Sequence, residues 1–328
     1  MFVPQEQSGL NEAAPAAPRR PYRLSRRPEE RVQVLGGTMD LVRPEEVFHF
    51  VTGKLESRQS AIVANHNLHS LYLIGKNRQI AEFYKAADLI EVDSTPLILW
   101  ARLVGRASRR FHRCTYLDWR DAFWALASEK AWKVFFVGGA PGVAERAVER
   151  IRQDWPNARI ETHHGYFDAT AGASENEAVV AKIRDYAPDI VLVGMGMPRQ
   201  EIWTLENHKA YGPAATFTVG GAFDYEAGVQ KAAPRWMGPL GMEWLFRLMA
   251  DPQRLFFRYC VEPWSLIGPA VADVARALSR SSTAVRSRAA EDARWEQIRA
   301  RNEAVRGEGH VNDRDSWPER HAVETQGA

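Results

Sequence analysis

Cysteine is scarce in this chain of 328 residues, in which only Cys114 and Cys260 occur. Neither lies in a spacing typical of a metal or redox site, so the sequence excludes a disulfide-rich scaffold and favours a reducing compartment. Long apolar runs are also missing, since no stretch approaches the ~20 apolar residues that a transmembrane helix needs. We therefore expect no membrane-spanning segment.

Charge of one sign is not in excess either. The chain has 43 Lys and Arg against 41 Asp and Glu, a formal net charge of +2. A protein that binds nucleic acid through bulk charge would be more basic, so we expect no nucleic-acid partner. With 45% hydrophobic and 26% charged residues, the composition is that of a folded protein with a substantial core.

Several motifs that carry chemistry are absent. Residues 194–199 begin as Gly-Met-Gly but have Arg199 where G-x-G-x-x-G needs its third glycine, and residues 138–142 do not fit that pattern. There is no Walker lysine motif and no G-x-S-x-G. The one Asp-x-Asp, at 313–315, falls in an expected C-terminal tail. These absences favour a site that uses neither a metal nor a cofactor.

The two ends of the chain differ in composition from the middle. Residues 1–30 are polar, rich in Pro, Ala and Arg, and without the apolar core of a signal peptide, so they predict a disordered arm. Residues 276–328 predict a polar tail with a short charged helix near 291–305. Between them we expect a main domain over 31–228 and an appendage over 229–275.

Six short apolar runs alternate with helical patterns across the main domain. This alternation predicts an α/β fold with a Rossmann-like, largely parallel sheet and helices on both faces. The predicted strands are 61–64, 89–92, 133–137, 158–161, 190–193 and 215–219.

Polar side chains follow these strands where each one ends. Because the carboxyl ends of parallel strands meet at one edge, where ligands bind, we expect the side chains to form one site. They are Asn65, Asn67, Asp93, His163, His164, Arg199 and Gln200. We leave the two histidines out of the catalytic set, because histidines at such positions are more often structural.

The stretch IVLVGMGMPRQEIW, residues 190–203, shows the pattern most clearly. A buried strand runs into Gly194 and Gly196, and Pro198 suits the first position of the following helix. The free N–H groups of that first turn favour an anion. The alternative is a tight connection that needs glycine for its geometry alone.

Five segments together resemble one family of bacterial enzymes. They are ADLIEVDS, VFFVGGAPGVAE, VGMGMPRQEIW, TVGGAFDYEAG and GMEWLFRLMADPQRLFFRY, in this order along the chain. Over roughly residues 33–259 the sequence is similar to the WecG/TagA/CpsF family of glycosyltransferases. The resemblance implies inverting transfer of a sugar from a UDP-sugar to a polyprenyl-diphosphate-linked sugar. It also implies a Rossmann-like catalytic domain and a helical C-terminal appendage, which completes the site and docks on the cytoplasmic membrane.

The catalytic base of that family matches Asp93, although Ser94 replaces the family's glycine. An inverting transfer needs one base to take the acceptor's proton, and a partly desolvated carboxylate at a strand end can do so. The alternative is that Asp93 caps the N-terminus of the next helix.

Other family residues carry over with departures. Asn65-His66-Asn67 matches a Thr-x-Asn motif, and Pro198–Glu201 matches Pro-Lys-Gln-Glu with Arg199 for lysine. The substrate-binding residues that the resemblance implies are Asn65, Asn67, Arg113, Arg199, Gln200, Arg247, Arg254 and Arg258. The nucleotide-binding residues that we expect are Gly138, Gly139, Tyr166, Gly194, Gly196, Gly220 and Asp224, with Asp224 at the uracil ring. Residues 232–234 are Ala-Ala-Pro, so the arginine of the family's Arg-Ala-Pro is missing.

These departures, together with NHNLHSLYL and HRCTYLDWRDAFW, resemble the branch that adds a β-1,4-linked glucose in xanthan- or acetan-type exopolysaccharide assembly. One alternative is a transferase of the same family that uses UDP-N-acetylmannosamine or its uronic acid. Another, from a different class, is a nucleotide-binding, membrane-docking module without turnover, against which Asp93 counts. The sequence does not decide the oligomeric state and is compatible with a homo-oligomer.

The expected appendage mixes aromatic and basic side chains. The residues concerned are Trp236, Trp244, Phe246, Phe256, Phe257, Trp264, Arg235, Arg247, Arg254 and Arg258. Such a mixture suits a membrane interface, where rings enter the headgroup layer and arginines meet phosphate. The alternative is a helical pair packed on the domain with solvated arginines. We expect a cytoplasmic protein that is peripheral on the inner face of the cell membrane.

Overall fold

The computed structural model describes residues 31–231, 233, 234, 237 and 242–280, with the side chain of Arg254 excepted. The predicted N-terminal arm, most of the predicted tail with its helix near 291–305, and the aromatic and basic residues at 235 and 236 lie outside the described residues. The chain divides into two compact units, one up to Val274 and one from Ala275. Every contact described below lies within the first unit.

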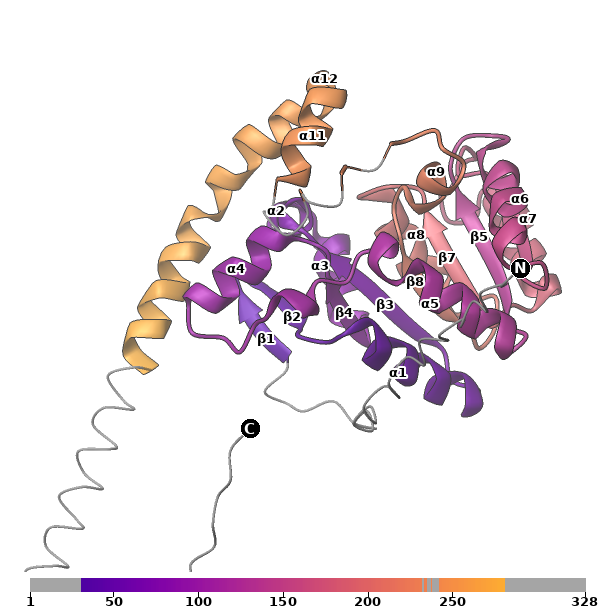
Figure 1. The fold of residues 1–328 in the computed structure, drawn as a ribbon, viewed down its shortest axis with the longest axis horizontal. Helices are drawn as coiled ribbons and strands as arrows, with labels where there is room; N and C mark the ends of the chain where they lie inside the picture. The colour runs from indigo at the N-terminus through magenta and orange to yellow at the C-terminus, as the bar shows by residue number, and fades with distance from the viewer. Residues whose placement is uncertain (1–30, 232, 235–236, 238–241, 281–328) are drawn as a thin grey trace, which may run out of the picture. The chain divides into compact units, whose positions relative to one another are not determined.

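A six-stranded parallel sheet forms the centre of the first unit (Figure 1). Its strands lie in the order β4-β3-β8-β7-β5-β6. Their bounds are β3 Ala61–His66, β4 Leu89–Val92, β5 Lys133–Gly138, β6 Arg159–His163, β7 Ile190–Gly194 and β8 Ala215–Thr218. All six predicted strands are therefore confirmed, and the prediction of an α/β fold with a largely parallel sheet is correct.

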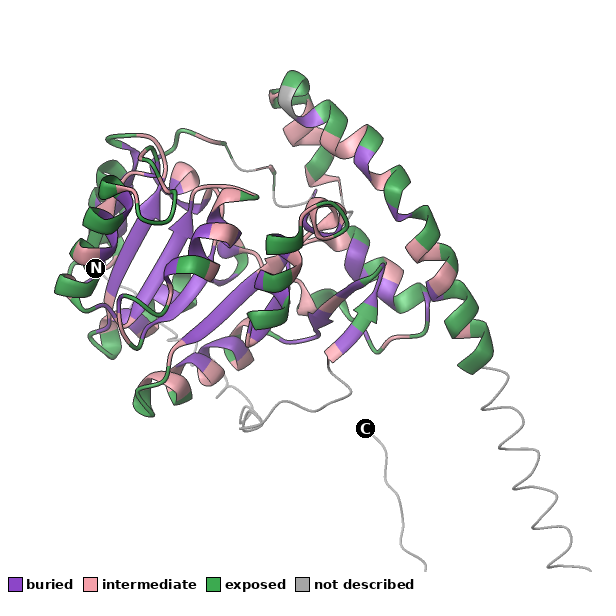
Figure 2. Cartoon of the chain, turned by 180° about the vertical axis from the view of Figure 1, so that it is seen from behind, coloured by how far each residue is buried: buried purple, intermediate pink, exposed green. Residues whose placement is uncertain are grey.

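Helices cover both faces of the sheet, as the strands' double-sided apolar pattern requires. Successive residues of β5 show the alternation, since Phe136 packs with α1 and α5 on one face and Phe135 packs with α7 and α8 on the other. Figure 2 shows the strands buried and the outer sides of the helices exposed. The helices of this layered core are α1 Pro44–Glu56, α2 Leu68–Ile74, α3 Arg78–Ala86, α4 Thr95–Leu103, α5 Tyr116–Glu129, α6 Val143–Asp154, α7 Ser174–Tyr186, α8 Arg199–Asn207 and α9 Ala222–Glu226, with a short 3₁₀ turn η2 at Arg110–His112.

A small antiparallel hairpin beside β4 was not predicted. It consists of β1, Arg31–Val34, and β2, Gly37–Asp40. Asp40 ties it to the sheet, because this buried carboxylate accepts hydrogen bonds from the Arg31 side chain at 2.9 Å and from the N–H of Ile90 at 2.8 Å.

Short helical elements follow the sheet and form the predicted C-terminal appendage. They are α11 Glu243–Ala250, α12 Pro252–Phe256, the π-helical turn η3 Phe257–Val261, the 3₁₀ turn η4 Glu262–Leu266 and helical residues 267–280. Two carboxylates attach this segment to the domain. Glu262 contacts His69 of α2 at 2.5 Å, and Asp273 accepts from the N–H of Leu35 at 2.7 Å and from Trp100 at 3.0 Å.

Candidate active site

The carboxyl ends of β5, β7 and β8 approach one another backbone to backbone. A Cβ on Gly138 would lie 2.4 Å from the carbonyl oxygen of Gly194, and a Cβ on Gly194 would lie 2.6 Å from that of Gly220. Close packing alone therefore requires glycine at 138 and 194. Gly196 has φ of 78° and open space around it, so there the turn itself selects glycine. A nucleotide role for these glycines, and for Gly139, stays a prediction.

Asp93 directly follows β4 and is partly buried. Its N–H donates to the carbonyl of His66 at 3.0 Å, which holds the residue in line with the end of β3. Helix α4 begins at Thr95 with Ser94 at the N-cap position. Asp93 therefore does not occupy the cap position of this helix, which counts against the capping alternative.

The groups around Asp93 have opposing effects on the pKa of its carboxyl. Burial raises the pKa of this carboxyl above its ordinary value, and Arg247, Arg258 and Arg113 lower it, in that order of strength. Glu243 raises the pKa further. The charges of three predicted arginines, one near the end of η2 and two in the C-terminal segment, thus act on one carboxyl group.

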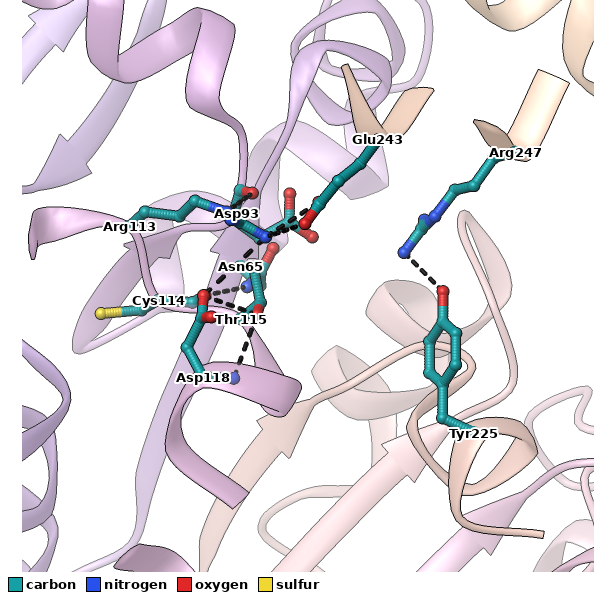
Figure 3. A network of polar contacts seen from close by, with 9 residues as sticks. All are labelled: Asn65, Asp93, Arg113, Cys114, Thr115, Asp118, Tyr225, Glu243 and Arg247. Carbon is teal, nitrogen blue, oxygen red and sulfur yellow. Dashed lines mark hydrogen bonds and ion pairs between the residues drawn. The ribbon is translucent and has the colours of Figure 1, made fainter. Parts of the chain in front are cut away.

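Arg113 is held from two sides. Its Nε donates to the backbone oxygen of Asp93 at 3.3 Å, and its Nη2 lies 2.9 and 2.8 Å from the two carboxylate oxygens of Glu243 (Figure 3). Glu243 is the first residue of α11, so this ion pair joins the appendage to the loop after η2. The sequence analysis did not identify Glu243.

Arg247 lies one helical turn beyond Glu243 and makes a second contact with the domain. Its Nη2 donates to the phenol oxygen of Tyr225 at 2.6 Å, and its guanidinium carbon lies 5.7 Å from the centre of that ring (Figure 3). Burial raises the pKa of Tyr225, which keeps the phenol protonated. Tyr225 was also missed. We call Asp93, Arg113, Tyr225, Glu243 and Arg247 the Asp93 cluster.

Asn65 and Asn67 have different roles. The side chain of Asn65 donates to the carbonyl of Cys114 at 3.3 Å, beside the Asp93 cluster (Figure 3). Asn67 is the N-cap of α2 and accepts from the N–H of Ser70 at 3.1 Å. His66 between them is buried, and its Nδ1 contacts the Ser70 hydroxyl at 2.8 Å. Burial lowers the pKa of His66 to about 3, so its ring is neutral.

The residues after β7 do not join the Asp93 cluster as a group. Helix α8 begins at Arg199, so Pro198 lies just before the helix and not at its first position as predicted. The Arg199 side chain donates to the carbonyl of Phe167 and lies over that residue's ring. Gln200 is buried and accepts from the N–H of Gly220 at 3.1 Å, which links the start of α8 to the turn after β8.

The other predicted ligand-binding residues are scattered around the strand ends. Tyr166 is 70% exposed, and the backbone oxygen of Asp224 accepts hydrogen bonds from the two residues 229 and 230. Arg258 lies in η3, and its Nε is buried without a hydrogen-bond partner among the described residues. His163 contacts the backbone oxygen of the neighbouring histidine. The predicted role of Arg254 rests on a side chain outside the described residues.

Two buried glutamates, one on β4 and one in the first turn of α8, were not among the predicted site residues. Glu91 is 3% exposed, two residues before Asp93 on β4, and burial raises its pKa to about 8. Glu201 is 1% exposed and accepts from Gln200 at 2.7 Å, and burial raises its pKa to about 7. A single charge inside the apolar run LIEV was the available signal for Glu91.

Within residues 31–231, 233, 234, 237 and 242–280, no group of three or more His, Cys, Asp or Glu side chains is arranged to hold a metal ion. In the same part of the chain, no helix combines the length and the apolar character that crossing a membrane would require.

The sequence is similar to known glycosyltransferases. A relative from Staphylococcus aureus (strain NCTC 8325 / PS 47) is 30% identical over 207 residues, which cover 58% of this chain and 77% of the relative. It is named N-acetylglucosaminyldiphosphoundecaprenol N-acetyl-beta-D-mannosaminyltransferase, and the protein of that name from strain MRSA252 matches with the same figures. These relatives do not support the glucose-adding branch that the sequence departures suggested. Residues 32–280 match the description "Glycosyl transferase WecG/TagA/CpsF family", and the chain belongs to this family.

Proposed function

We propose that this glycosyltransferase moves a sugar from a UDP-sugar to a polyprenyl-diphosphate-linked sugar, with Asp93 as the catalytic base. The observation that carries the proposal is the setting of Asp93 at the end of β4, where Arg113 donates to its backbone oxygen at 3.3 Å and where Arg247 and Arg258 lower the pKa of its partly buried carboxyl. A base needs partial desolvation, and a diphosphate needs cationic donors near the same point. The partly buried Asp93 fits the first requirement, and the three arginines fit the second.

The proposed reaction is a single displacement with inversion. Asp93 takes the proton of the acceptor hydroxyl as that oxygen forms a bond to the anomeric carbon of the donor. The bond between this carbon and the UDP oxygen breaks, and UDP leaves with the electron pair. Arginine side chains and the N-terminus of α6 stabilise the negative charge that develops on the diphosphate.

The names of the relatives favour N-acetylmannosamine as the donor sugar over glucose. A second candidate is glucose, which is supported by the departures from the family pattern at Asn65 and Ser94. Both lie beside the proposed base, and Asn65 turns its amide to the carbonyl of Cys114. The departure at Arg199 carries less weight, because its side chain contacts the Phe167 loop.

Membrane docking through the C-terminal helices is part of the proposal. Phe257, Val261, Trp264, Ile267 and Val271 are exposed and recur every three or four residues along η3, η4 and the helix that follows. This spacing places apolar side chains along one side of a helical segment, where they can enter the headgroup layer. A lipid-linked acceptor would then be met at the membrane surface, on the cytoplasmic side where UDP-sugars are made.

The experiment is a donor and acceptor panel. The full chain is incubated with UDP-N-acetylmannosamine, UDP-N-acetylglucosamine or UDP-glucose, and with polyprenyl-diphosphate-linked N-acetylglucosamine or glucose, and products are weighed by mass spectrometry. We expect one added N-acetylhexosamine with the first donor. One added hexose from UDP-glucose would select the second candidate. UDP binding without any product would favour the non-catalytic module.

A further inference from the structure

Tyr225 lies on α9, beside the end of β8, and the reaction proposed above gives it no part. Its phenol oxygen accepts a 2.6 Å hydrogen bond from Arg247, and its ring lies beneath the same guanidinium. Arg247 in turn is the cation that acts most strongly on Asp93. Tyr225 therefore contacts the arginine whose charge acts on the proposed base.

Helix α9 is a firm support for such a contact. Its last residue, Glu226, is buried and accepts from Tyr116 at 2.6 Å and from Arg120 at 2.5 Å. Arg150 of α6 donates to the backbone oxygen of Glu226 at 3.2 Å. Bonds from α5 to the Glu226 carboxylate and from α6 to its backbone oxygen, with buried Phe223 packed in the core, fix the position of Tyr225.

Helix α11, in contrast, has no buried residue. Its residues are half-buried or exposed, so polar contacts with the domain help to fix its position. Glu243 and Arg247 are four residues apart and share one side of the helix, and they are the residues that bond to Arg113 and Tyr225. Among the residues that the structure describes, the Tyr225 hydroxyl is the hydrogen-bond partner of the Arg247 guanidinium, so Tyr225→Phe removes this support.

We propose that Tyr225 is a positioning residue, whose hydroxyl holds the Arg247 guanidinium at the end of the sheet, on the same helix whose Glu243 pairs with Arg113 next to Asp93. This role rests on the proposed function, in which Asp93 must accept a proton. The titratable and charged groups that face Asp93 from the surrounding elements are Glu91, Tyr84, Arg113, Tyr225, Glu243, Arg247 and Arg258.

The expected direction follows from the charges. Burial raises the pKa of Asp93, and Arg247 opposes this effect. In Tyr225→Phe the ring remains and the hydroxyl is lost, so Arg247 is held less firmly and the pKa of Asp93 rises. Because the reaction needs ionised Asp93, the acid limb of the profile of kcat/KM against pH should move to higher pH.

The test is a double-mutant cycle read as pH profiles. We expect Tyr225→Phe to lower kcat/KM about tenfold near pH 6, the order expected for one hydrogen bond to a charged group, and to move the acid limb upward. Arg247→Gln should produce a larger shift in the same direction. In the Arg247→Gln background, Tyr225→Phe should have no further effect, because its partner is gone.

Tyr211→Phe is the matched control. It also removes a buried phenol hydroxyl, which contacts Thr216 at 2.8 Å, but it lies under α8 and away from Asp93. We expect a lower Tm with an unmoved acid limb. If Tyr225→Phe behaved like this control, or if its effect persisted in full beside Arg247→Gln, Tyr225 would be a structural residue only.

Two further outcomes also decide the matter. If Tyr225→Phe does not fold, Arg247→Gln alone decides. An unchanged acid limb of its kcat/KM profile overturns the proposed role of Tyr225, and an acid limb at higher pH supports it. If the wild-type enzyme is active and the effects of Tyr225→Phe and Arg247→Gln on kcat/KM are additive, the role of Tyr225 is rejected and the proposed function is unaffected. A wild-type chain that transfers no sugar rejects the proposed function itself, and the role of Tyr225 with it.

Discussion

Arg113 and Glu243 are 130 residues apart in the sequence and form an ion pair beside Asp93, with one guanidinium nitrogen 2.9 and 2.8 Å from the two carboxylate oxygens. The pair binds the first turn of α11 to the loop that follows η2. It also places a second negative charge close to the proposed base. The two charges of the pair therefore act on Asp93 in opposite directions.

Removing the charge of Glu243 should change the pH profile in the direction opposite to Tyr225→Phe. Glu243 raises the pKa of Asp93, so Glu243→Gln should lower it and move the acid limb of kcat/KM to lower pH. A glutamine can still accept from Arg113. The shift should shrink in high salt, because Glu243 is a third exposed. An upward shift would contradict this assignment.

Glu91 should make the fold less stable as pH rises. Its pKa is about 8 in the folded chain and its ordinary value is 4.5, so the folded state retains a proton that the unfolded state releases. The stability that this group contributes is present at low pH and is lost between about pH 4.5 and 8. Glu91→Gln should raise Tm at pH 8 and make Tm less dependent on pH. At pH 8 the free energy of unfolding should rise by at least ~1 kcal/mol.

The matched control for Glu91 is the exposed Glu129, at the end of α5. Glu129→Gln should leave the profile of Tm against pH unchanged. Equal behaviour of the two variants in thermal unfolding from pH 5 to 8 would show that Glu91 is not buried in the way described.

Activity should survive treatment with EDTA. The proposed stabilisation of the leaving diphosphate uses arginine side chains and helix N-termini, which need no divalent ion. The assay compares initial rates in EDTA with those in magnesium or manganese. Complete loss in EDTA, with recovery on adding either metal, would overturn this part of the mechanism.

The exposed aromatic side chains of the C-terminal helices should matter for lipid more than for nucleotide. Phe257→Ser with Trp264→Ser should weaken binding to vesicles that contain anionic lipid and raise KM for the lipid acceptor, while UDP affinity stays within about twofold. Phe111→Ser is the control, since Phe111 is an exposed aromatic on η2. Equal vesicle binding by all three proteins would favour ordinary domain packing.

The strands were predictable because their signal is local. Each of the six runs has β-branched or aromatic residues followed by a turn, and burial on both faces keeps five of the runs continuous, whereas the edge strand β6 is buried only in part. The hairpin Arg31–Asp40 was missed because its stabilising contact, between Asp40 and the N–H of Ile90, joins residues 50 apart.

The polar contacts of the site were predictable only in part. Asp93 and the arginines came from motif resemblance, and the parallel sheet explains why strand-end residues meet. The partners Glu243 and Tyr225 could not be inferred, because each pairs with an arginine on another element and periodicity gives no such information. Asn67 shows another limit of the pattern, since a polar residue that follows a strand also caps the next helix, and its substrate contact stays a prediction.

The most direct test of the account is Asp93→Asn, with sugar transfer and UDP binding measured on the same preparation. The amide fits the same space but cannot take a proton, so we predict turnover lower by ~10²–10⁴. UDP affinity by calorimetry should stay near the wild-type value, and Tm should not fall, because burial disfavours the charged carboxylate. Turnover near that of the wild type, in the variant with normal UDP binding, would remove Asp93 from the reaction and contradict the proposed mechanism.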